Sequence, residues 1–199
     1  TFSPDSRRLG YFAKQDETWY LVINDSQVTT IEDQDGPLGL VLEGRGGYAF
    51  SVFEGSVYRL APGAGESNEP EQGKDYTWVE TLFLSPDGAR VAYLARTYAS
   101  RVRAYESWAM VIDGNEDPEF TEVFSQSFRF SPNSRHYAYV AASIHADELG
   151  YQVVLDGQPT QRYTGLVKGG PNFNSDGTLE FLAMRSDTLY KVVLSPDEK

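Results

Sequence analysis

The sequence contains no cysteine and only two histidines among its 199 residues. The lack of cysteine excludes disulfides, thiolate nucleophiles and Cys-ligated zinc. The nucleophile elbow Gly-x-Ser-x-Gly is also absent, and with so little histidine there are few bases to activate another nucleophile. We therefore expect no catalytic apparatus and no cofactor, and we interpret the chain as more consistent with a non-enzyme.

Basic residues and long apolar runs are scarce as well. There are 17 Lys and Arg against 29 Asp and Glu, which gives a formal net charge of −12. A nucleic-acid-binding protein normally presents a basic face, so nucleic acid is not expected as a partner. No run of apolar residues approaches the roughly 18 that a membrane helix needs, so we expect no membrane insertion. No segment has helical periodicity over about ten residues.

What the sequence does contain is a repeated turn motif. Its elements are an apolar residue, Ser, Pro, an acid or amide, and a small residue. The copies are Phe2-Ser3-Pro4-Asp5-Ser6, Leu84-Ser85-Pro86-Asp87-Gly88, Phe130-Ser131-Pro132-Asn133-Ser134 and the degraded Phe173-Asn174-Ser175-Asp176-Gly177. Proline presets φ in such a turn, and Asp, Asn and Gly complete it.

An aromatic residue follows each turn in a short strand-like run. These aromatics are Tyr11, Phe50, Tyr93, Tyr139 and Phe181, with steps of 39, 43, 46 and 42 residues. Near Phe50 the turn motif is replaced by a Gly-rich stretch, so this copy is the weakest. Five copies at a period of about 40–45 residues match the four-stranded blade of a β-propeller.

Further runs of β-branched and aromatic residues follow each aromatic and end at turns such as Asp113-Gly114 and Asp156-Gly157. Asp-Gly between strand-like runs is a strong hairpin signal. Each repeat thus predicts four strands: one before the Ser-Pro-Asp turn, one with the aromatic, one ending at Asp-Gly, and one after it. We expect the fourth strands at 119–124 and 160–164.

The predicted fold is all-β: one β-propeller domain over 1–199 with about five four-stranded blades. The expected blades are approximately 1–36, 37–80, 81–126, 127–169 and 170–199. The first begins within its first strand, and the last ends after its third. Our hypothesis is therefore that the chain is a segment of a larger propeller, or a ring with one three-stranded blade.

The repeat resembles that of the TolB-like, WD-repeat-like β-propellers of bacteria, which reads roughly Phe-Ser-Pro-Asp-Gly-(Lys/Arg)-x-(Ile/Val)-Ala-(Tyr/Phe). The match is closest at 84–94 and 130–140, and it extends over essentially the whole chain. Propellers of this kind act as protein-docking platforms and as gating domains of serine peptidases. The resemblance implies a structural role for the motif residues, so it carries over no catalytic residue.

The repeated acids and the two histidines have structural interpretations. A side chain that recurs at the same turn position usually bonds the local backbone, which we expect for Asp5, Asp87, Asn133 and Asp176. His136 is expected to be a packed or surface strand residue. His145, near Asp147 and Glu148, could take part in metal binding, but one histidine with adjacent acids favours a solvated loop.

The least regular feature is an Arg- and Tyr-rich segment at 96–107. Arginine and tyrosine are favoured at binding hot spots, and arginine binds carboxylates and phosphates in a bidentate way. The alternative is that these arginines neutralise neighbouring acids. We nevertheless predict a binding surface from this segment together with His145; its residues are Arg96, Tyr98, Arg101, Arg103, Tyr105 and His145.

The sequence therefore favours a non-catalytic binding or scaffolding propeller with a protein partner. One alternative is a gating or substrate-binding part of a larger hydrolase, and another is a carbohydrate-active propeller enzyme. The sequence identifies no small-molecule ligand. A periplasmic or extracellular location is favoured over a cytoplasmic one.

Overall fold

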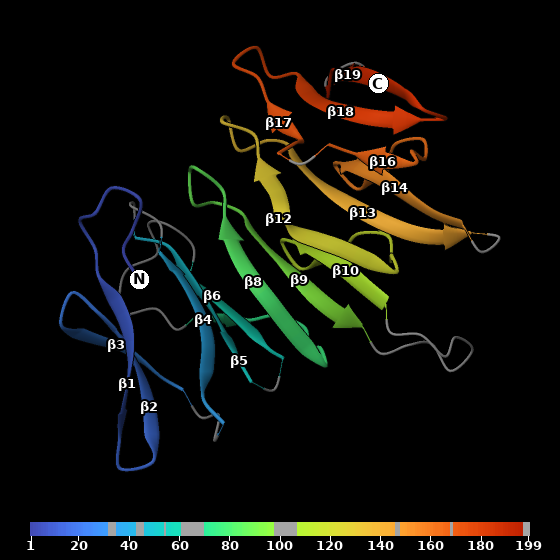
Figure 1. The fold of residues 1–199 in the computed structure, drawn as a ribbon. Helices are drawn as coiled ribbons and strands as arrows, with labels where there is room; N and C mark the ends of the chain where they lie inside the picture. The colour runs from blue at the N-terminus through green and yellow to red at the C-terminus, as the bar shows by residue number, and fades with distance from the viewer. Residues whose placement is uncertain are drawn as a thin grey trace. The chain divides into compact units, whose positions relative to one another are not determined.

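The computed structural model describes residues 1–31, 35–42, 46–53, 55–60, 70–97, 107–145, 148–167 and 169–196. Within these ranges the chain forms only strands, turns and irregular segments, arranged as five antiparallel sheets (Figure 1). The all-β prediction is confirmed. No described helix is long and apolar enough to cross a membrane. The chain divides into two compact units, residues 1–98 with 110–116 and residues 99–109 with 117–199.

The first unit contains two complete sheets and most of a third. The first sheet has the order β1 (Gly10–Gln15), β2 (Thr18–Ile23), β3 (Ser26–Ile31). The second has the order β4 (Pro37–Leu42), β5 (Tyr48–Val52), β6 (Val57–Leu60), β7 (Glu71–Gln72). The third has the order β11 (Asn115–Glu116), β10 (Ser107–Ile112), β9 (Val91–Thr97), β8 (Trp78–Leu84).

The second unit contains two sheets. The fourth sheet has the order β12 (Glu122–Phe130), β13 (Tyr137–His145), β14 (Glu148–Leu155), β15 (Gln158–Pro159). The fifth comprises β16 (Gly165–Leu166), β17 (Asn172–Phe173), β18 (Leu179–Arg185), β19 (Thr188–Leu194). Because β19 pairs with β18 along its whole length, the short β16 and β17 both pair along the opposite edge of β18.

The strands form where the sequence combines β-branched and aromatic residues, and tight turns join them. Asp113 and Gly114 have φ of 51° and 81°, and Asp156 and Gly157 have φ of 48° and 74°. Two consecutive residues with positive φ are what a two-residue hairpin turn of type I′ requires, so the Asp-Gly hairpins are confirmed.

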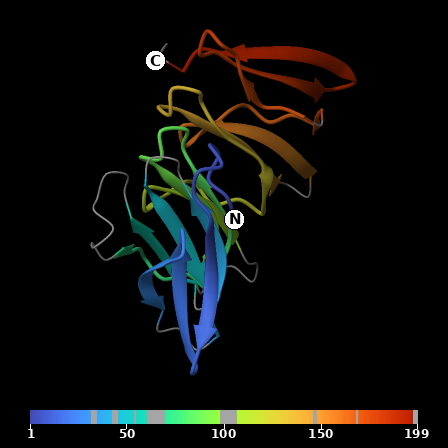
Figure 2. The same ribbon diagram turned by 90° about the vertical axis from the view of Figure 1, so that its left-hand side faces the viewer.

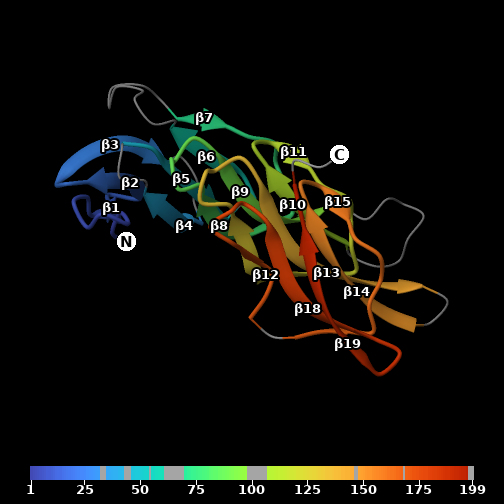
Figure 3. The same ribbon diagram turned by 90° about the horizontal axis from the view of Figure 1, so that it is seen from above.

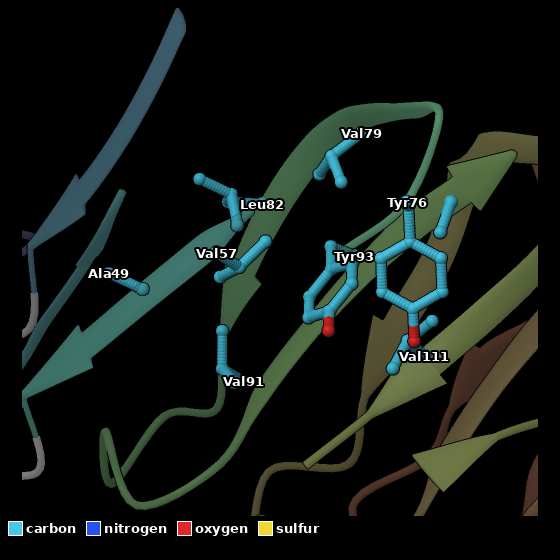
Figure 4. Close-up of a cluster of buried hydrophobic side chains, with 9 residues drawn as sticks. Ala49, Val57, Tyr76, Val79, Leu82, Val91, Tyr93 and Val111 are labelled. Carbon is cyan, nitrogen blue, oxygen red and sulfur yellow. The ribbon is translucent and has the colours of Figure 1, made fainter. Parts of the chain in front are cut away.

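Hydrophobic cores lie between neighbouring sheets of a unit. In the first unit β1 contacts β4 and β4 contacts β8, so the blue, teal and green sheets of Figures 1 and 3 lie in succession. One core lies between the first two sheets and includes Leu21, Ile31 and Phe50. Another, shown in Figure 4, includes Val57, Tyr76 and Tyr93. In the second unit a third core is built around strands β13, β14 and β18.

The same kind of aromatic contact recurs at three of the aligned aromatic residues. The aligned aromatics Tyr93, Tyr139 and Phe181 each meet, edge to face, an aromatic ring that precedes them in the chain. The pairs and their centroid separations are Tyr76–Tyr93 at 5.8 Å, Phe120–Tyr139 at 6.4 Å and Tyr163–Phe181 at 5.8 Å. T-shaped pairs at this distance add stabilisation beyond the burial of their area. The preceding partners were not recognised from the sequence, although their spacing to the aligned aromatic is nearly constant.

The fourth strands are shorter than expected. The prediction of a fourth strand at 119–124 is wrong in its second half, because Glu122 already belongs to β12 and pairs in the next sheet. β11 ends at Glu116, since Pro118 offers no N–H to the ladder. Only Phe120 returns to pair, as an isolated bridge to Trp108. The expected segment 160–164 likewise makes one bridge, Tyr163 to Tyr151, after β15.

The changes of sheet also differ from the predicted blade limits. The limits at 80/81 and 126/127 fall inside β8 and β12, and the limit at 169/170 falls between β16 and β17. The predicted limits left only three residues before each turn motif for the first strand, whereas β8 and β12 begin earlier, at Trp78 and Glu122. The division of the whole chain into five blades of a single propeller domain stays a proposal.

Candidate functional site

Most of the predicted Arg- and Tyr-rich binding segment lies outside the described residues. This applies to Tyr98, Arg101, Arg103 and Tyr105. Arg96 is described: it lies in β9, half-buried and opposite Trp78, and its carbonyl accepts a hydrogen bond of 2.8 Å from the Thr77 hydroxyl. Arg96 therefore marks the base of the segment, and the segment as a binding surface stays a prediction.

His145 is the last residue of β13, where it is exposed and lies opposite Glu148. Asp147, which the metal-binding alternative combined with His145 and Glu148, is not among the described residues. Across the described parts of the chain, no group of three or more His, Asp or Glu side chains gathers to hold a metal ion. His145 and Arg96 are the two described residues of the predicted binding surface, and they lie on β13 and β9.

The repeated turn acids bind their own backbone, as predicted. In the fourth sheet the buried Ser131 hydroxyl donates to Asn133 Oδ1 at 2.7 Å and accepts from the His136 N–H at 2.9 Å. Asn133 Oδ1 also accepts from the Arg135 N–H at 3.1 Å. The same pattern of bonds surrounds Asp5 and Asp87.

The degraded turn of the fifth sheet keeps part of this pattern. Asp176 accepts hydrogen bonds from the Thr178 hydroxyl at 2.7 Å and from the Thr178 N–H at 3.0 Å. These two bonds hold the pKa of Asp176 below its ordinary value. Hydrogen bonds from the Ser3 hydroxyl and the Arg7 N–H lower the pKa of Asp5 in the same way. Asp5 and Asp176 are therefore ionised turn-forming groups rather than candidate ligands.

A second recurring polar position was missed in the sequence. The acid that opens the Asp-Gly turn reaches back to the start of the strand that carries the aligned aromatic. Asp113 accepts from the Val91 N–H at 2.9 Å and from Arg90 Nε at 2.8 Å. Asp156 accepts from the Tyr137 N–H at 3.0 Å.

His136 occupies the place of Arg90 in this arrangement. Its Nδ1 lies 2.7 Å from Asp156 Oδ2, and the side chain is mostly buried, just before β13. The expected packed or surface strand residue is therefore a packed one, but it lies just before the strand and not within it. The sequence signal that could have found it is the basic or imidazole side chain that precedes β9 and β13 and pairs with the Asp of the following hairpin.

The most buried polar cluster in the second unit is centred on Asp117. Its two carboxylate oxygens accept hydrogen bonds from the Tyr137 hydroxyl at 2.8 Å and from the Tyr139 hydroxyl at 3.0 Å. Burial, and then the charge of Asp117, raise the pKa of Tyr139 far above its ordinary value. Tyr139 is thus a neutral donor, and the cluster ties the segment after β11 to β13.

At the corresponding position of the first unit a glycine replaces Asp117, and the carboxylate of Glu116, from β11, acts on the Tyr76 and Tyr93 phenols instead. Gly73 lies three residues before Tyr76, as Asp117 lies three residues before Phe120, and a Cβ on Gly73 would lie 3.6 Å from the Tyr93 hydroxyl. The buried Tyr76 hydroxyl makes no hydrogen bond of good geometry with any described residue. Figure 4 shows the Tyr76 and Tyr93 hydroxyls pointing the same way. Burial raises the pKa of Tyr76, so this phenol is also neutral.

Several exposed apolar side chains lie on the hairpin of β18 and β19, drawn in red in Figure 2. Phe181 and Ala183 of β18 point into the core, whereas the residues between and after them point outward. The outward set is Leu182 (37% exposed), Met184 (41%), Leu189 (57%) and Val193 (51%). Across this face the Lys191 ammonium lies 2.8 Å from the Glu180 carboxylate.

Comparison with known proteins identifies the fold. No family model matches the sequence, and no curated protein matches it. Solved structures do match. They include puromycin hydrolase, with 14% identity, a TM-score of 0.51 and coverage of 96% of this chain. Tricorn protease matches with 14% identity, a TM-score of 0.51 and coverage of 84%.

TolB from Acinetobacter baumannii is also similar, with 17% identity, a TM-score of 0.43 and coverage of 81% of this chain. The chain spans 36% of the puromycin hydrolase chain, 18% of the tricorn protease chain and 42% of the TolB chain. At these identities the similarity establishes the fold alone. The predicted β-propeller architecture is confirmed by the succession of antiparallel sheets together with the similarity to the first two of these structures.

Proposed function

We propose that this chain is a non-catalytic binding module that engages a protein partner. The observation that carries the proposal is the exposed apolar face of β18 and β19, formed by Leu182, Met184, Leu189 and Val193. The matching residues of β13 are covered: Val140 is 8% exposed and Ala142 is 0% exposed. An apolar face that is buried in one repeat and open in another is typical of a surface reserved for a partner.

The recurring polar side chains support a structural rather than a catalytic role for the repeats. The turn acids and the hairpin acids are bonded to their own backbone or to a neighbouring base. The described residues therefore present no recurring set of polar groups that converges on a reacting atom. Activity, if the chain supports any, would rest on groups outside these repeats.

The Arg- and Tyr-rich segment is the second proposed contact surface. It would comprise Arg96, Tyr98, Arg101, Arg103 and Tyr105, with His145 as a further exposed residue. Arginine recognises carboxylates bidentately, so this segment suits an acidic patch on the partner, in contrast to the apolar face of β18 and β19. We also propose a periplasmic or extracellular setting for this interaction.

A second candidate is a gating or substrate-binding propeller that works beside a hydrolase domain. It is favoured by the names of two of the similar structures, tricorn protease and puromycin hydrolase, of which this chain matches only a part. Under this candidate the apolar face of β18 and β19 would contact another domain of the same enzyme.

Affinity capture with matched surface variants tests the protein-binding proposal. The wild-type chain is compared with Leu182→Lys/Met184→Lys and with Arg101→Glu/Arg103→Glu, each checked for a native circular dichroism spectrum. We expect at least one protein that the wild type retains and one of the two variants loses. If every retained protein is retained equally by both variants, the proposal is contradicted.

A further inference from the structure

The two units provide for their buried tyrosine hydroxyls in different ways. In the second unit the Tyr139 hydroxyl donates to the Asp117 carboxylate at 3.0 Å. In the first unit Tyr76 is 4% exposed, and its hydroxyl forms no hydrogen bond of good geometry with any described residue. We propose, independently of the protein-binding function above, that the Tyr76 and Tyr93 hydroxyls bind one buried water molecule beside Gly73.

A lone hydroxyl at this place would be unfavourable. Tyr76 belongs to the apolar core that also contains Val57, Val79 and Val111 (Figure 4). A hydroxyl that is buried without a hydrogen bond destabilises the folded state, and buried polar groups are therefore bonded almost everywhere to protein or to ordered water. A water molecule supplies the bond where the surrounding side chains do not.

Polar groups converge near the Tyr76 hydroxyl. The Tyr76 and Tyr93 rings meet edge to face at 5.8 Å, and Figure 4 shows their hydroxyls pointing the same way. Burial raises the pKa of both phenols, and the nearby Glu116 carboxylate raises it further, so both are neutral and can donate and accept. Two hydroxyls and one carboxylate give a water molecule as many partners as buried waters usually have.

The absence of a side chain on Gly73 provides the space. Gly73 corresponds to Asp117, because each lies three residues before the ring that packs on the aligned aromatic. A Cβ on Gly73 would lie 3.4 Å from the Val57 carbonyl oxygen and 3.6 Å from the Tyr93 hydroxyl, with no nearer atom outside the neighbouring residues of the chain. A group of the size of a methyl or a water molecule therefore fits beside the Tyr93 hydroxyl, where the second unit places a carboxylate.

The charges around the site select a neutral occupant. The Lys74 ammonium forms an ion pair with the Glu116 carboxylate and also lies over the Tyr76 ring, 5.3 Å from the ring centre. The Glu116 charge therefore already has its counter-ion, so a second cation is not needed. An anion would be repelled by Glu116, whose carboxylate acts on both phenols. Water is the neutral donor and acceptor that meets these conditions.

A crystal structure of the whole chain, at a resolution that shows ordered water, tests the proposal. We expect one water molecule within hydrogen-bond distance of both the Tyr76 and the Tyr93 hydroxyl oxygens, and its density should be lost in the Tyr76→Phe variant. Urea unfolding gives an independent readout: Tyr76→Phe should unfold at a lower urea concentration than the wild type, because it removes a hydroxyl that is bonded. Tyr190→Phe, at a tyrosine that is 45% exposed, is the control and should unfold at the wild-type concentration.

Three results would overturn the proposal. The first is a crystal structure in which no water contacts the Tyr76 hydroxyl. The second is a Tyr76→Phe variant that unfolds at the wild-type urea concentration or above it, because removing an unpaired buried hydroxyl relieves its cost. The third is binding of a carboxylate at the site: sodium formate would then raise the unfolding temperature of the wild type above its value in equal sodium chloride, and Tyr76→Phe would cancel that difference. None of these results bears on the protein-binding function.

Discussion

Strands β13 and β18 hold the same place in successive repeats, yet β13 is buried on both faces over 137–142 and β18 on only one. Leu182 and Met184, which point outward from β18, are as apolar as Val140 and Ala142 at the matching positions of β13. Their exposure therefore reflects what lies against the sheet and not a change in side-chain chemistry. The comparison teaches that the repeat specifies two contact faces per sheet, and that the fifth sheet retains a contact face that is exposed in this structure.

The largest effect should come from placing a charge on the buried strand. Val140→Asp puts a carboxylate where the side chain is 8% exposed. We expect a loss of about 3 kcal/mol or more in the free energy of unfolding, because a buried unpaired charge is strongly unfavourable. Leu182→Asp at the matching position of β18 should cost less than about 1 kcal/mol. Urea denaturation of the two variants gives both values.

Equal destabilisation by the two substitutions would show that the outward face of β18 is covered in solution. Leu182→Ala and Val140→Ala serve as controls for the loss of side-chain volume without the charge. Val140→Ala should still lower the free energy of unfolding more than Leu182→Ala, with smaller losses than for the aspartate variants.

The second effect concerns the Asp117 cluster. Asp117→Ala leaves the Tyr137 and Tyr139 hydroxyls without their acceptor, which should lower the free energy of unfolding by about 2 kcal/mol or more. Further substitution of both tyrosines with phenylalanine should recover part of that loss, because no buried donor is then left unpaired. If Asp117→Ala alone is neutral in thermal and urea unfolding, the cluster does not stabilise the fold.

A smaller effect is expected at the repeated turn. Ser131→Ala removes the hydroxyl that bonds Asn133 and the His136 N–H, with an expected loss of about 1 kcal/mol. The turn of the fifth sheet provides the comparison, because Ser175→Ala leaves the bonds of Asp176 to Thr178 in place. The Ser175 variant should unfold at the wild-type urea concentration. A Ser131 variant that does the same would contradict a stabilising role for the motif.

The smallest effect is on pH dependence. The pKa of Asp5 and of Asp176 is lower in the folded chain than the ordinary value of 3.8. As the pH falls, these carboxylates bind protons in the unfolded state before they do so in the folded state. The stability that each group contributes is therefore present above pH 3.8 and is lost as the pH falls through its folded pKa. Both carboxylates are exposed, and the effect is correspondingly small. NMR titration should give midpoints below 3.8 for both, and midpoints at or above 3.8 would contradict the turn hydrogen bonds.

The sequence predicted most of the fold and little of the candidate surface. The turn motif and the spacing of the aligned aromatics depend on local chemistry that each repeat carries by itself, so the strands and Asp-Gly hairpins followed from them. The aromatic partners Phe120 and Tyr163 were missed because their contacts join segments that are separate in sequence. The outward face of Leu182 and Met184 was missed because the sequence of β18 looks like that of a fully buried strand. Only the environment of the sheet distinguishes the two.

Hydrogen exchange at two amides tests the central claim most directly. Tyr151 donates its N–H to Tyr163, whereas the matching N–H of Leu189 faces an edge that no described strand covers. The account predicts slow exchange at Tyr151 and fast exchange at Leu189. Slow exchange at Leu189 would contradict it.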